Sequence, residues 1–495
     1  MSSQTLREAR KTEEIMAKQI GPLERPAFHL TPQTGWMNDP NGFCWHDGMY
    51  HMFYQYNPYS SHWDSMHWGH AVSRDLLHWE FLPAALAPDE LYDCDGCFSG
   101  SAMTLDDGRL LLMYTGVRNE RGQDGRTVEI QTQNIAIGDG VDFEKIAENP
   151  VLDEKDLPEG ASRNDFRDPK IIRREDGTYA ALIGSRPADG SGQILIYTSS
   201  DCIHWTYEGK LAENRCRFGK MWECPDFFRL DGKDVLLTSP QDMLPEGFEY
   251  HNGNGTLCLI GKVDEKTHAL IEEHNQSIDY GIDYYAPQTV LTPDGRRVMI
   301  GWMQNWDTLP IREPHEKWAG QMSLPRELSV KDGRLWQKPL RELEDYRTEE
   351  VSVQGLEVSG ETFIENVRGR TIDMELTIRR CENKENFDRF SMWLAMDDKF
   401  HTSLSYRPRE RTLKIDRKFS GSRRAIIHQR RALVDEKDGA LKLRLILDRY
   451  SVEVFVNDGE QVMSAALYTP LEADAISFRC DGKCRIDLKK WDLVL

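Results

Sequence analysis

Apolar and polar positions repeat along the first two thirds of the chain with a period of about sixty residues. Five times an Asp-Gly pair is followed by a strand-like apolar run, with the glycines at Gly48, Gly108, Gly177, Gly232 and Gly295. Asp-Gly between apolar runs is a strong hairpin signal, because both central positions of a type I′ turn favour positive φ. The pattern therefore predicts five copies of one hairpin-containing unit.

A second motif supports this period. The segments SRDLLHW (73–79) and SSDCIHW (199–205) lie 126 residues apart, which is about two periods. Five units, each with a hairpin and two further strands, describe a five-bladed β-propeller.

The pattern changes near residue 337. Segments such as LKLRL (441–445) and VEVFV (452–456) alternate apolar and polar residues with period 2, which favours an antiparallel β-sandwich. The segment KPLRELEDYR predicts a short connecting helix. We therefore expect an all-β chain: an N-terminal helical segment over 1–24, a five-bladed β-propeller over 25–335, a linker helix over 336–349 and a β-sandwich over 350–495.

The charge balance restricts the partners. The net charge is −20, from 62 basic and 82 acidic residues, which disfavours nucleic acid and anionic membranes. No apolar run approaches the roughly 20 residues of a membrane span. The first twenty residues lack the apolar core of a signal peptide, so we expect a cytoplasmic, bacterial protein.

Two groups of residues could suggest a metal. The pairs Cys94/Cys97 and Cys480/Cys484 could form a four-thiolate zinc site, but they lie in different predicted domains, so reduced thiols are expected. The segment HWDSMHWGH contains His62, His67 and His70, which we interpret as polar residues on a sheet rim because no carboxylate lies at a recognisable spacing. We expect no metal and no cofactor.

The repeat also predicts where acidic side chains gather. The positions eight residues before the five turn aspartates are Asp39, Ser99, Asp168, Glu223 and Ala286. We expect them on the innermost strand of each blade, lining the central channel. Three acids at the same distance from the propeller axis repel each other when ionised, which raises the pKa of at least one of them. Such a site can hold one carboxylate that attacks and one carboxylic acid that donates a proton. A binding-only or cation site would also fit.

Tryptophans are frequent around these acids. Their indole faces suit sugar rings, although packing in the core is the alternative for each of them: Trp36, Trp63, Trp68, Trp222, Trp302 and Trp306. Two carboxylates that flank a glycosidic bond can hydrolyse it, with retention or inversion depending on their separation. Spacing along the chain leaves that choice open.

At these residues the chain resembles glycoside hydrolase family 32, the invertases, sucrose-6-phosphate hydrolases and fructanases. The resemblance is carried by WMNDPNG (36–42), FYQYNP (53–58), FSGS (98–101), FRDP (166–169), WECPD (222–226) and LILDRYSVEVFVNDG (445–459). It implies retention of configuration, with Asp39 as the nucleophile and Glu223 as the acid and base. Asp168 would hold fructose hydroxyls and stabilise the transition state.

The same resemblance implies a fructose pocket. Its expected residues are Trp36, Asn38, Gln55, Trp63, Phe98, Ser99, Arg167 and Trp302. Arg167 also has a physical reason to be there, because a neighbouring cation favours ionised Asp168. Cys224 is not expected to be a nucleophile, since no recognisable base accompanies it.

The expected reaction is hydrolysis of sucrose 6-phosphate or sucrose. Sucrose 6-phosphate is the first choice, with Arg118, Arg121 and Arg163 as candidate phosphate ligands. An intracellular fructo-oligosaccharide hydrolase and a fructosyltransferase would use the same site. A non-catalytic sugar-binding propeller would require the loss of one of the three acids, and WMNDPNG disfavours an arabinan-degrading enzyme. The C-terminal domain is the expected surface for homo-oligomer contacts.

Overall fold

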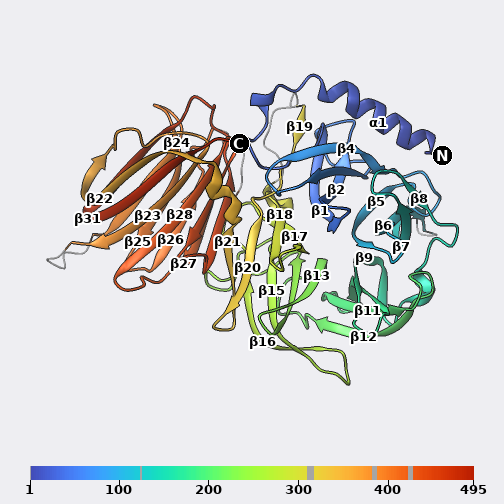
Figure 1. Ribbon diagram of the computed structural model, residues 1–495. Helices are drawn as coiled ribbons and strands as arrows, with labels where there is room; N and C mark the ends of the chain where they lie inside the picture. The colour runs from blue at the N-terminus through green and yellow to red at the C-terminus, as the bar shows by residue number, and fades with distance from the viewer. Residues whose placement is uncertain (1, 123–124, 309–316, 382–386, 422–426) are drawn as a thin grey trace.

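The computed structural model describes residues 2–122, 125–308, 317–381, 387–421 and 427–495. The chain begins with helix α1 (Gln4–Ala17) and is then built almost entirely of strands in two modules that lie side by side (Figure 1). Short 3-10 helices interrupt the strands: η1 (Pro22–Glu24), η2 (Glu154–Asp156), η3 (Trp306–Thr308) and η4 (Arg341–Tyr346). No helix in the described parts of the chain is long and apolar enough to cross a bilayer.

The first module is a five-bladed β-propeller, as predicted, with four antiparallel strands in every blade. Blades one and two contain β1 (Gly35–His46), β2 (Met49–Asn57), β3 (His67–Ser73) and β4 (Trp79–Leu86), then β5 (Gly96–Thr104), β6 (Leu110–Arg121), β7 (Thr127–Gly138) and β8 (Phe143–Lys145). Blade three contains β9 (Ala161–Arg173), β10 (Tyr179–Pro187), β11 (Gln193–Ser199) and β12 (Thr206–Glu213).

Blades four and five complete the ring. They contain β13 (Trp222–Leu230), β14 (Lys233–Pro240), β15 (Leu257–Val263) and β16 (Leu270–Ser277), then β17 (Tyr285–Leu291), β18 (Arg297–Trp302), β20 (Arg326–Lys331) and β21 (Arg334–Pro339). The short strand β19 (Trp318–Ala319) returns to blade one and pairs in parallel with β1. This pairing ties the last part of the propeller to the first blade.

Each Asp-Gly pair lies in the connection between the first and second strands of its blade. Asp47-Gly48 and Asp231-Gly232 form two-residue turns in which both residues have positive φ (44° and 78°, 49° and 77°). The other three connections are five residues long, and only the glycine of the pair has positive φ. The tight-turn expectation is therefore right for two blades and wrong for three. In those three blades the longer loop does not require positive φ at the aspartate.

The second motif forms the same turn in blades one and three. Asp75 Oδ1 accepts hydrogen bonds from the amides of Leu77 (2.9 Å) and His78 (2.8 Å) between β3 and β4. Asp201 accepts the equivalent bonds, at 2.9 and 2.8 Å, between β11 and β12. The two segments are thus equivalent in structure as well as in sequence.

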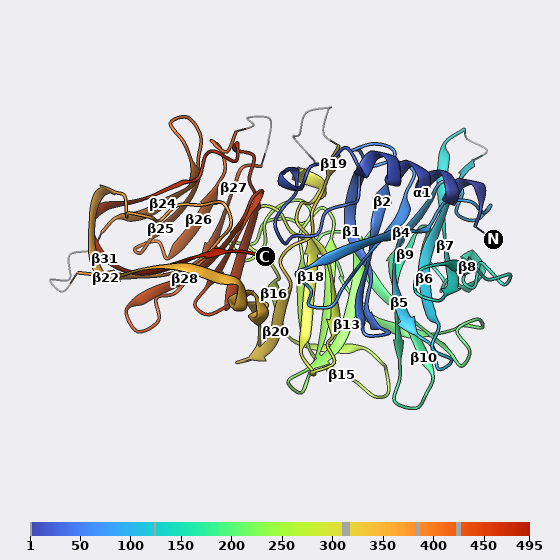
Figure 2. The same cartoon turned by 45° about the horizontal axis from the view of Figure 1, so that its top comes forward.

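The second module is the predicted β-sandwich. Its strands are β22 (Arg347–Thr362), β23 (Ile372–Arg380), β24 (Arg389–Met396), β25 (Thr402–Arg407), β26 (Thr412–Asp416), β27 (Gln429–Leu433), β28 (Ala440–Asp448), β29 (Ser451–Val456), β30 (Gln461–Ala466) and β31 (Ala475–Leu493). The first half of β31 pairs with β24 and the second half with β23, so this long strand belongs to both layers. Figure 2 shows the two layers beside the propeller.

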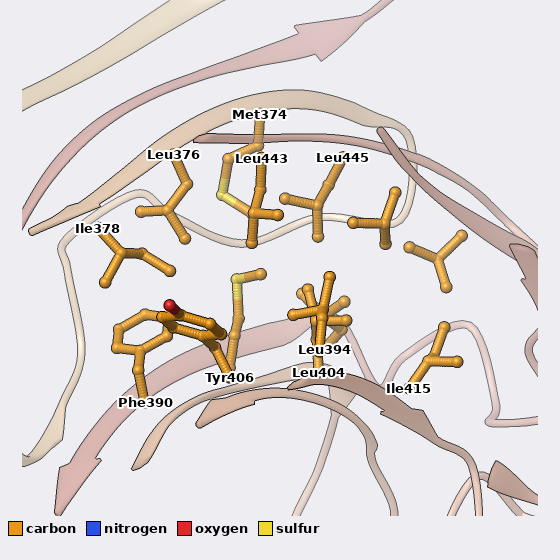
Figure 3. Close-up of a cluster of buried hydrophobic side chains, with 14 of the residues drawn as sticks. Met374, Leu376, Ile378, Phe390, Leu394, Leu404, Tyr406, Ile415, Leu443 and Leu445 are labelled. Carbon is orange, nitrogen blue, oxygen red and sulfur yellow. The ribbon is translucent and has the colours of Figure 1, made fainter. Parts of the chain in front are cut away.

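Alternation along the strands fills the core of the sandwich. Alternate residues of β23 and β28, such as Leu376 and Leu443, point toward Phe390, Leu404 and Tyr406 from the facing layer (Figure 3). Successive side chains of a strand point to opposite faces, which is why a period-2 pattern builds this core. The exact residue limits of the two domains remain a prediction from the sequence.

A buried ion network joins the two modules. Both ring nitrogens of His29 donate to carboxylates, Nδ1 to Asp448 Oδ2 at 2.9 Å and Nε2 to Glu453 Oε1 at 3.0 Å. Arg326, from the propeller, binds Glu453 and lies 3.0 Å from Asp279. Burial of the His29 ring opposes its charge, but the two carboxylates outweigh burial and raise the pKa of His29 to about 9. His29 is therefore a cation between two anions.

Candidate active site

The five first strands form the inner ring of the propeller. Each of β1, β5, β9, β13 and β17 contacts the first strands of both neighbouring blades. Each also contains a β-bulge, which gives it one more residue than its partner strand has at that point. The bulged residues are Asn38 and Asp39, Ser99, Asp168 and Pro169, Cys224 and Pro225, and Ala286 and Pro287.

This register corrects one part of the sequence prediction. Asp39 and Asp168 lie in their bulges, but the bulge of blade four contains Cys224. Glu223 precedes the bulge and pairs with Ser239, at the register that Arg167 occupies in blade three. The count of eight residues from the turn is displaced by one in blade four, where Cys224 lies seven residues before Asp231, whereas Asp168 lies eight residues before Asp176.

The three acids nevertheless line one cavity of about 560 Å³. The size is typical of a small-molecule site. Asp39 and Asp168 are buried, with 7% and 6% of their surface exposed, and Glu223 lies beside them with its side chain 13% exposed. The prediction that Asp39, Asp168 and Glu223 converge is therefore confirmed, although their positions are not strictly equivalent.

Cys224 lies between the two buried aspartates. Its amide donates to Asp168 Oδ2 at 3.0 Å, and its Sγ lies 3.5 Å from Asp39 Oδ2 and 3.6 Å from Asp168 Oδ2. Ser99 Oγ donates to Asp39 Oδ2 at 3.2 Å. Burial raises the pKa of the Cys224 thiol well above its ordinary value, and the neighbouring carboxylates add to this, so the thiol stays protonated as a donor.

Burial and like charges keep protons in this cluster. Burial, followed by Glu223 and Asp168, raises the pKa of Asp39 to about 7. Burial also raises the pKa of Asp168, and Arg167 lowers it without cancelling the effect. The expectation that Arg167 keeps Asp168 ionised is thus only one of two opposing effects, since burial outweighs it.

Arg167 instead makes its close contacts with two other acids. Its Nη2 and Nε lie 3.0 and 3.2 Å from Glu223 Oε1, and its Nη1 lies 3.0 Å from Asp165, whereas its Nε is 4.0 Å from Asp168. The Tyr285 hydroxyl donates to Glu223 Oε2 at 2.6 Å. Both oxygens of Glu223 are therefore held in place, by a cation and by a phenol.

Most of the predicted pocket residues line the cavity. These are Asn38, Gln55, Trp63, Phe98, Ser99 and Arg167. Trp63 is 46% exposed, and its ring meets Phe98 and Trp306 edge to face, with centroids 6.0 and 6.4 Å apart. Gln55 Nε2 donates to the Cys97 carbonyl at 2.9 Å, which fixes its amide.

Trp36 and Trp302 do not line the cavity. They are buried, 1% and 0% exposed, and their rings meet at 5.9 Å behind the wall. Trp36 Nε1 donates to Asn38 Oδ1 at 2.7 Å, and Trp302 packs against Trp306 at 5.1 Å. Both therefore support side chains that face the cavity. Core packing is also the correct interpretation of Trp68 and Trp222, which are buried.

Several lining residues were missed by the sequence argument. They are Glu129, Gln131, Asn164, Asp165, Gln241, Asp242, Asn254 and Trp306, and Tyr285 contacts Glu223 from behind. Trp306 belongs to η3 and Tyr285 begins the inner strand β17. The other side chains come from β7, from the start of β9 and from the loop after β14, where no repeat aligns the blades. Trp306 was noted only as one of six nearby tryptophans.

The histidine motif is placed differently from the expectation. His67 and His70 are buried within β3, so they are core residues rather than rim residues. His70 Nε2 lies 3.1 Å from His51 Nδ1, and burial lowers the pKa of His67 to about 4. Within the described residues no cluster of His, Cys, Asp and Glu has the arrangement of a metal site.

Comparison with known proteins places both modules in one family. The model of the glycosyl hydrolases family 32 N-terminal domain matches residues 29–339, and that of the family 32 C-terminal domain matches 342–492. A sucrose-6-phosphate hydrolase of Escherichia coli is 37% identical over 91% of each chain. A raffinose invertase of Escherichia coli is 38% identical over 96% of each chain.

Solved structures agree with this assignment. A Bombyx mori β-fructofuranosidase mutant in complex with sucrose superposes with a TM-score of 0.85 and 31% identity, covering 100% of this chain and 99% of that one. A sucrose-6-phosphate hydrolase of Lactobacillus gasseri superposes with a TM-score of 0.83 and 28% identity, covering 100% and 97%.

Proposed function

The chain belongs to glycosyl hydrolase family 32, and on that premise we propose that it is a retaining β-fructofuranosidase that works through a covalent fructosyl-enzyme. That it is a glycoside hydrolase follows from its relatives, which include sucrose-6-phosphate hydrolases and an invertase over nearly their whole lengths. The substrate in this proposal is sucrose or sucrose 6-phosphate.

The observation that carries the proposal is the cluster of three acids in one cavity. Asp39 attacks the anomeric carbon of the fructosyl unit while Glu223 gives its proton to the departing glycosidic oxygen. The carbon–oxygen bond to glucose breaks as the ester bond to Asp39 forms. Glu223, now a carboxylate, takes a proton from water, and the hydroxide oxygen displaces Asp39.

The surroundings of the acids suit these roles. Ser99 and Cys224 donate to the Asp39 oxygen Oδ2, which supports the carboxylate that attacks. Arg167 and Tyr285 fix the orientation of Glu223. Asp168, held by the Cys224 amide, accepts hydrogen bonds from fructose hydroxyls in this mechanism and stabilises the developing positive charge.

The test compares isosteric variants of the two acids. Asp39→Asn and Glu223→Gln should each lower kcat for sucrose by at least about a thousandfold, with an unchanged circular dichroism spectrum. Asp47→Asn, which neutralises an exposed acid in the turn eight residues after Asp39, should leave kcat unchanged.

Stereochemistry tests the covalent step. NMR during the first turnovers should show β-fructofuranose before mutarotation, because two inversions at one carbon restore its configuration. Release of the α anomer, or near wild-type turnover of a folded Asp39→Asn variant, would refute the mechanism.

The state of the thiols supports the expected location. None of the ten cysteines forms a disulfide. Even the exposed Cys94 and Cys216 are free thiols. Free thiols are typical of reducing compartments. We therefore propose that the protein works in the cytoplasm.

A further inference from the structure

The lining of the active-site cavity is strongly acidic. Six of its side chains are carboxylic acids and, among the described residues, one is a cation. Beyond the catalytic cluster the acids are Glu129, Asp165 and Asp242, which lie on β7, on β9 and in the loop after β14. An anionic wall of this kind disfavours an anionic group on the substrate.

The one cation that lines the cavity among the described residues already has two acidic partners. Arg167 is buried, and its guanidinium lies 3.0 Å from both Glu223 and Asp165. The cations just outside the lining are paired with its acids as well: Arg186 lies 2.6 Å from Asp165, and Lys220 lies 3.1 Å from Asp242. A phosphate would therefore have to compete with carboxylates for every one of these cations.

The arginines expected from the sequence to bind phosphate lie elsewhere. Arg118, Arg121 and Arg163 do not line the cavity. Arg118 pairs with Glu120 at 2.6 Å and Arg163 with Glu154 at 3.2 Å, both on exposed surface. Arg118 also faces away from Glu129, because its cross-strand partner is Ile130 and Glu129 pairs with Asn119.

Neutral hydrogen-bonding groups form much of the rest of the wall. Gln131, Asn164, Gln241 and Asn254 present amides to the cavity. Amides donate and accept, as sugar hydroxyls do, and they carry no charge to attract an anion. Gln131 Nε2 also donates to Glu129 at 2.6 Å, so an uncharged amide holds this carboxylate.

We propose that this wall is a charge filter that selects an uncharged leaving sugar and rejects its phosphorylated form, with Glu129 and Asp242 as the specificity-determining residues. The inference rests on the fructosidase function proposed above and deepens it. It replaces sucrose 6-phosphate, the first choice from the sequence, with sucrose or another neutral fructoside. Rejection by like charge is a common means of specificity.

The experiment measures kcat/KM of the full-length protein for sucrose and sucrose 6-phosphate at pH 7.5 and low ionic strength. The wild type should prefer sucrose at least tenfold. The double variant Glu129→Gln, Asp242→Asn should narrow this preference several-fold, chiefly by raising kcat/KM for the phosphorylated sugar. Added salt should narrow the wild-type preference too, because it screens the wall.

Glu120→Gln is the matched control. It removes a carboxylate from the same pair of strands, at a position outside the cavity lining, and should leave the preference unchanged. Equal or better hydrolysis of sucrose 6-phosphate by the wild type would overturn the charge filter, as would an unchanged preference in the double variant. A folded wild type that hydrolyses neither sugar would overturn the proposed function itself, and this inference with it.

Discussion

His29 lies where the propeller meets the sandwich, and its replacement by alanine would leave Asp448 and Glu453 without their shared cation. Both carboxylates are buried, so neither can recover its charge stabilisation from water. Arg326 still binds Glu453, but Asp448 keeps only backbone amides as partners. We therefore expect His29→Ala to destabilise the contact between the modules.

The pKa of His29 sets the size of the effect. The rise from 6.5 to about 9 on folding corresponds to about 3 kcal/mol of stabilisation. Because the folded pKa is raised, this contribution is complete below pH 6.5 and disappears as the pH rises through 9. Removal of one member of a buried ion pair typically costs about 3–5 kcal/mol, which agrees with this value.

The assay is urea unfolding followed by tryptophan fluorescence at pH 6 and pH 10. His29→Ala should be less stable than the wild type by about 3–5 kcal/mol at pH 6, and the difference should shrink by about 3 kcal/mol at pH 10. Groups that titrate in both proteins cancel in this difference. His204→Ala, at an 85% exposed side chain, should change stability by no more than about 0.5 kcal/mol at either pH. If the wild type exceeded His29→Ala in free energy of unfolding by the same amount at both pH values, the reasoning would be refuted.

Two further predictions concern the active site. Tyr285→Phe removes the 2.6 Å hydrogen bond to Glu223, which should lower kcat about tenfold or more, because one oxygen of Glu223 loses the group that orients it. An unchanged kcat in the folded variant would show that Tyr285 contributes only packing. Cys224→Ala removes the thiol between Asp39 and Asp168, so the acidic limb should move to higher pH, because Asp39 loses a donor that lowers its pKa. Cys224→Ser keeps a donor and should move the limb less; the opposite order of the two variants would contradict this role.

The architecture could be predicted from the sequence because both modules depend on local patterns. The five Asp-Gly turns mark the five blades, and the alternation in segments such as 452–456 marks the sandwich. Gathering of Asp39, Asp168 and Glu223 also follows from the repeat, since inner strands of a propeller face one axis. The family resemblance supplied the expected fructose pocket, and six of its eight residues line the cavity.

The parts of the site that the sequence did not predict depend on features that do not repeat along the chain. Glu129 and Asp242 reach the cavity from outside the inner strands, on segments that differ from blade to blade. Trp36 and Trp302 belong to matching motifs, but a motif does not distinguish a residue that contacts the ligand from one that supports it. In blade four the bulge begins one residue nearer to the turn aspartate than in blade three, which counting from the turn could not detect.

The bulges explain how the inner strands can supply so many polar groups to one cavity. In a regular strand, consecutive side chains point to opposite faces, so each inner strand would offer only alternate residues to the axis. A bulge re-aims one residue, and it lets neighbours share a face. The consecutive pairs Asn38–Asp39, Phe98–Ser99 and Arg167–Asp168 all line the cavity, and in blade four Glu223 lines it while Cys224 contacts both aspartates. The second member of each pair is one of the two buried aspartates or contacts at least one of them. The first member lies in the surrounding wall, where Arg167 contacts Glu223. The site therefore comes from one irregularity repeated around the ring, and in the proposed mechanism the chemical differences between blades assign attack, proton transfer and support to separate strands.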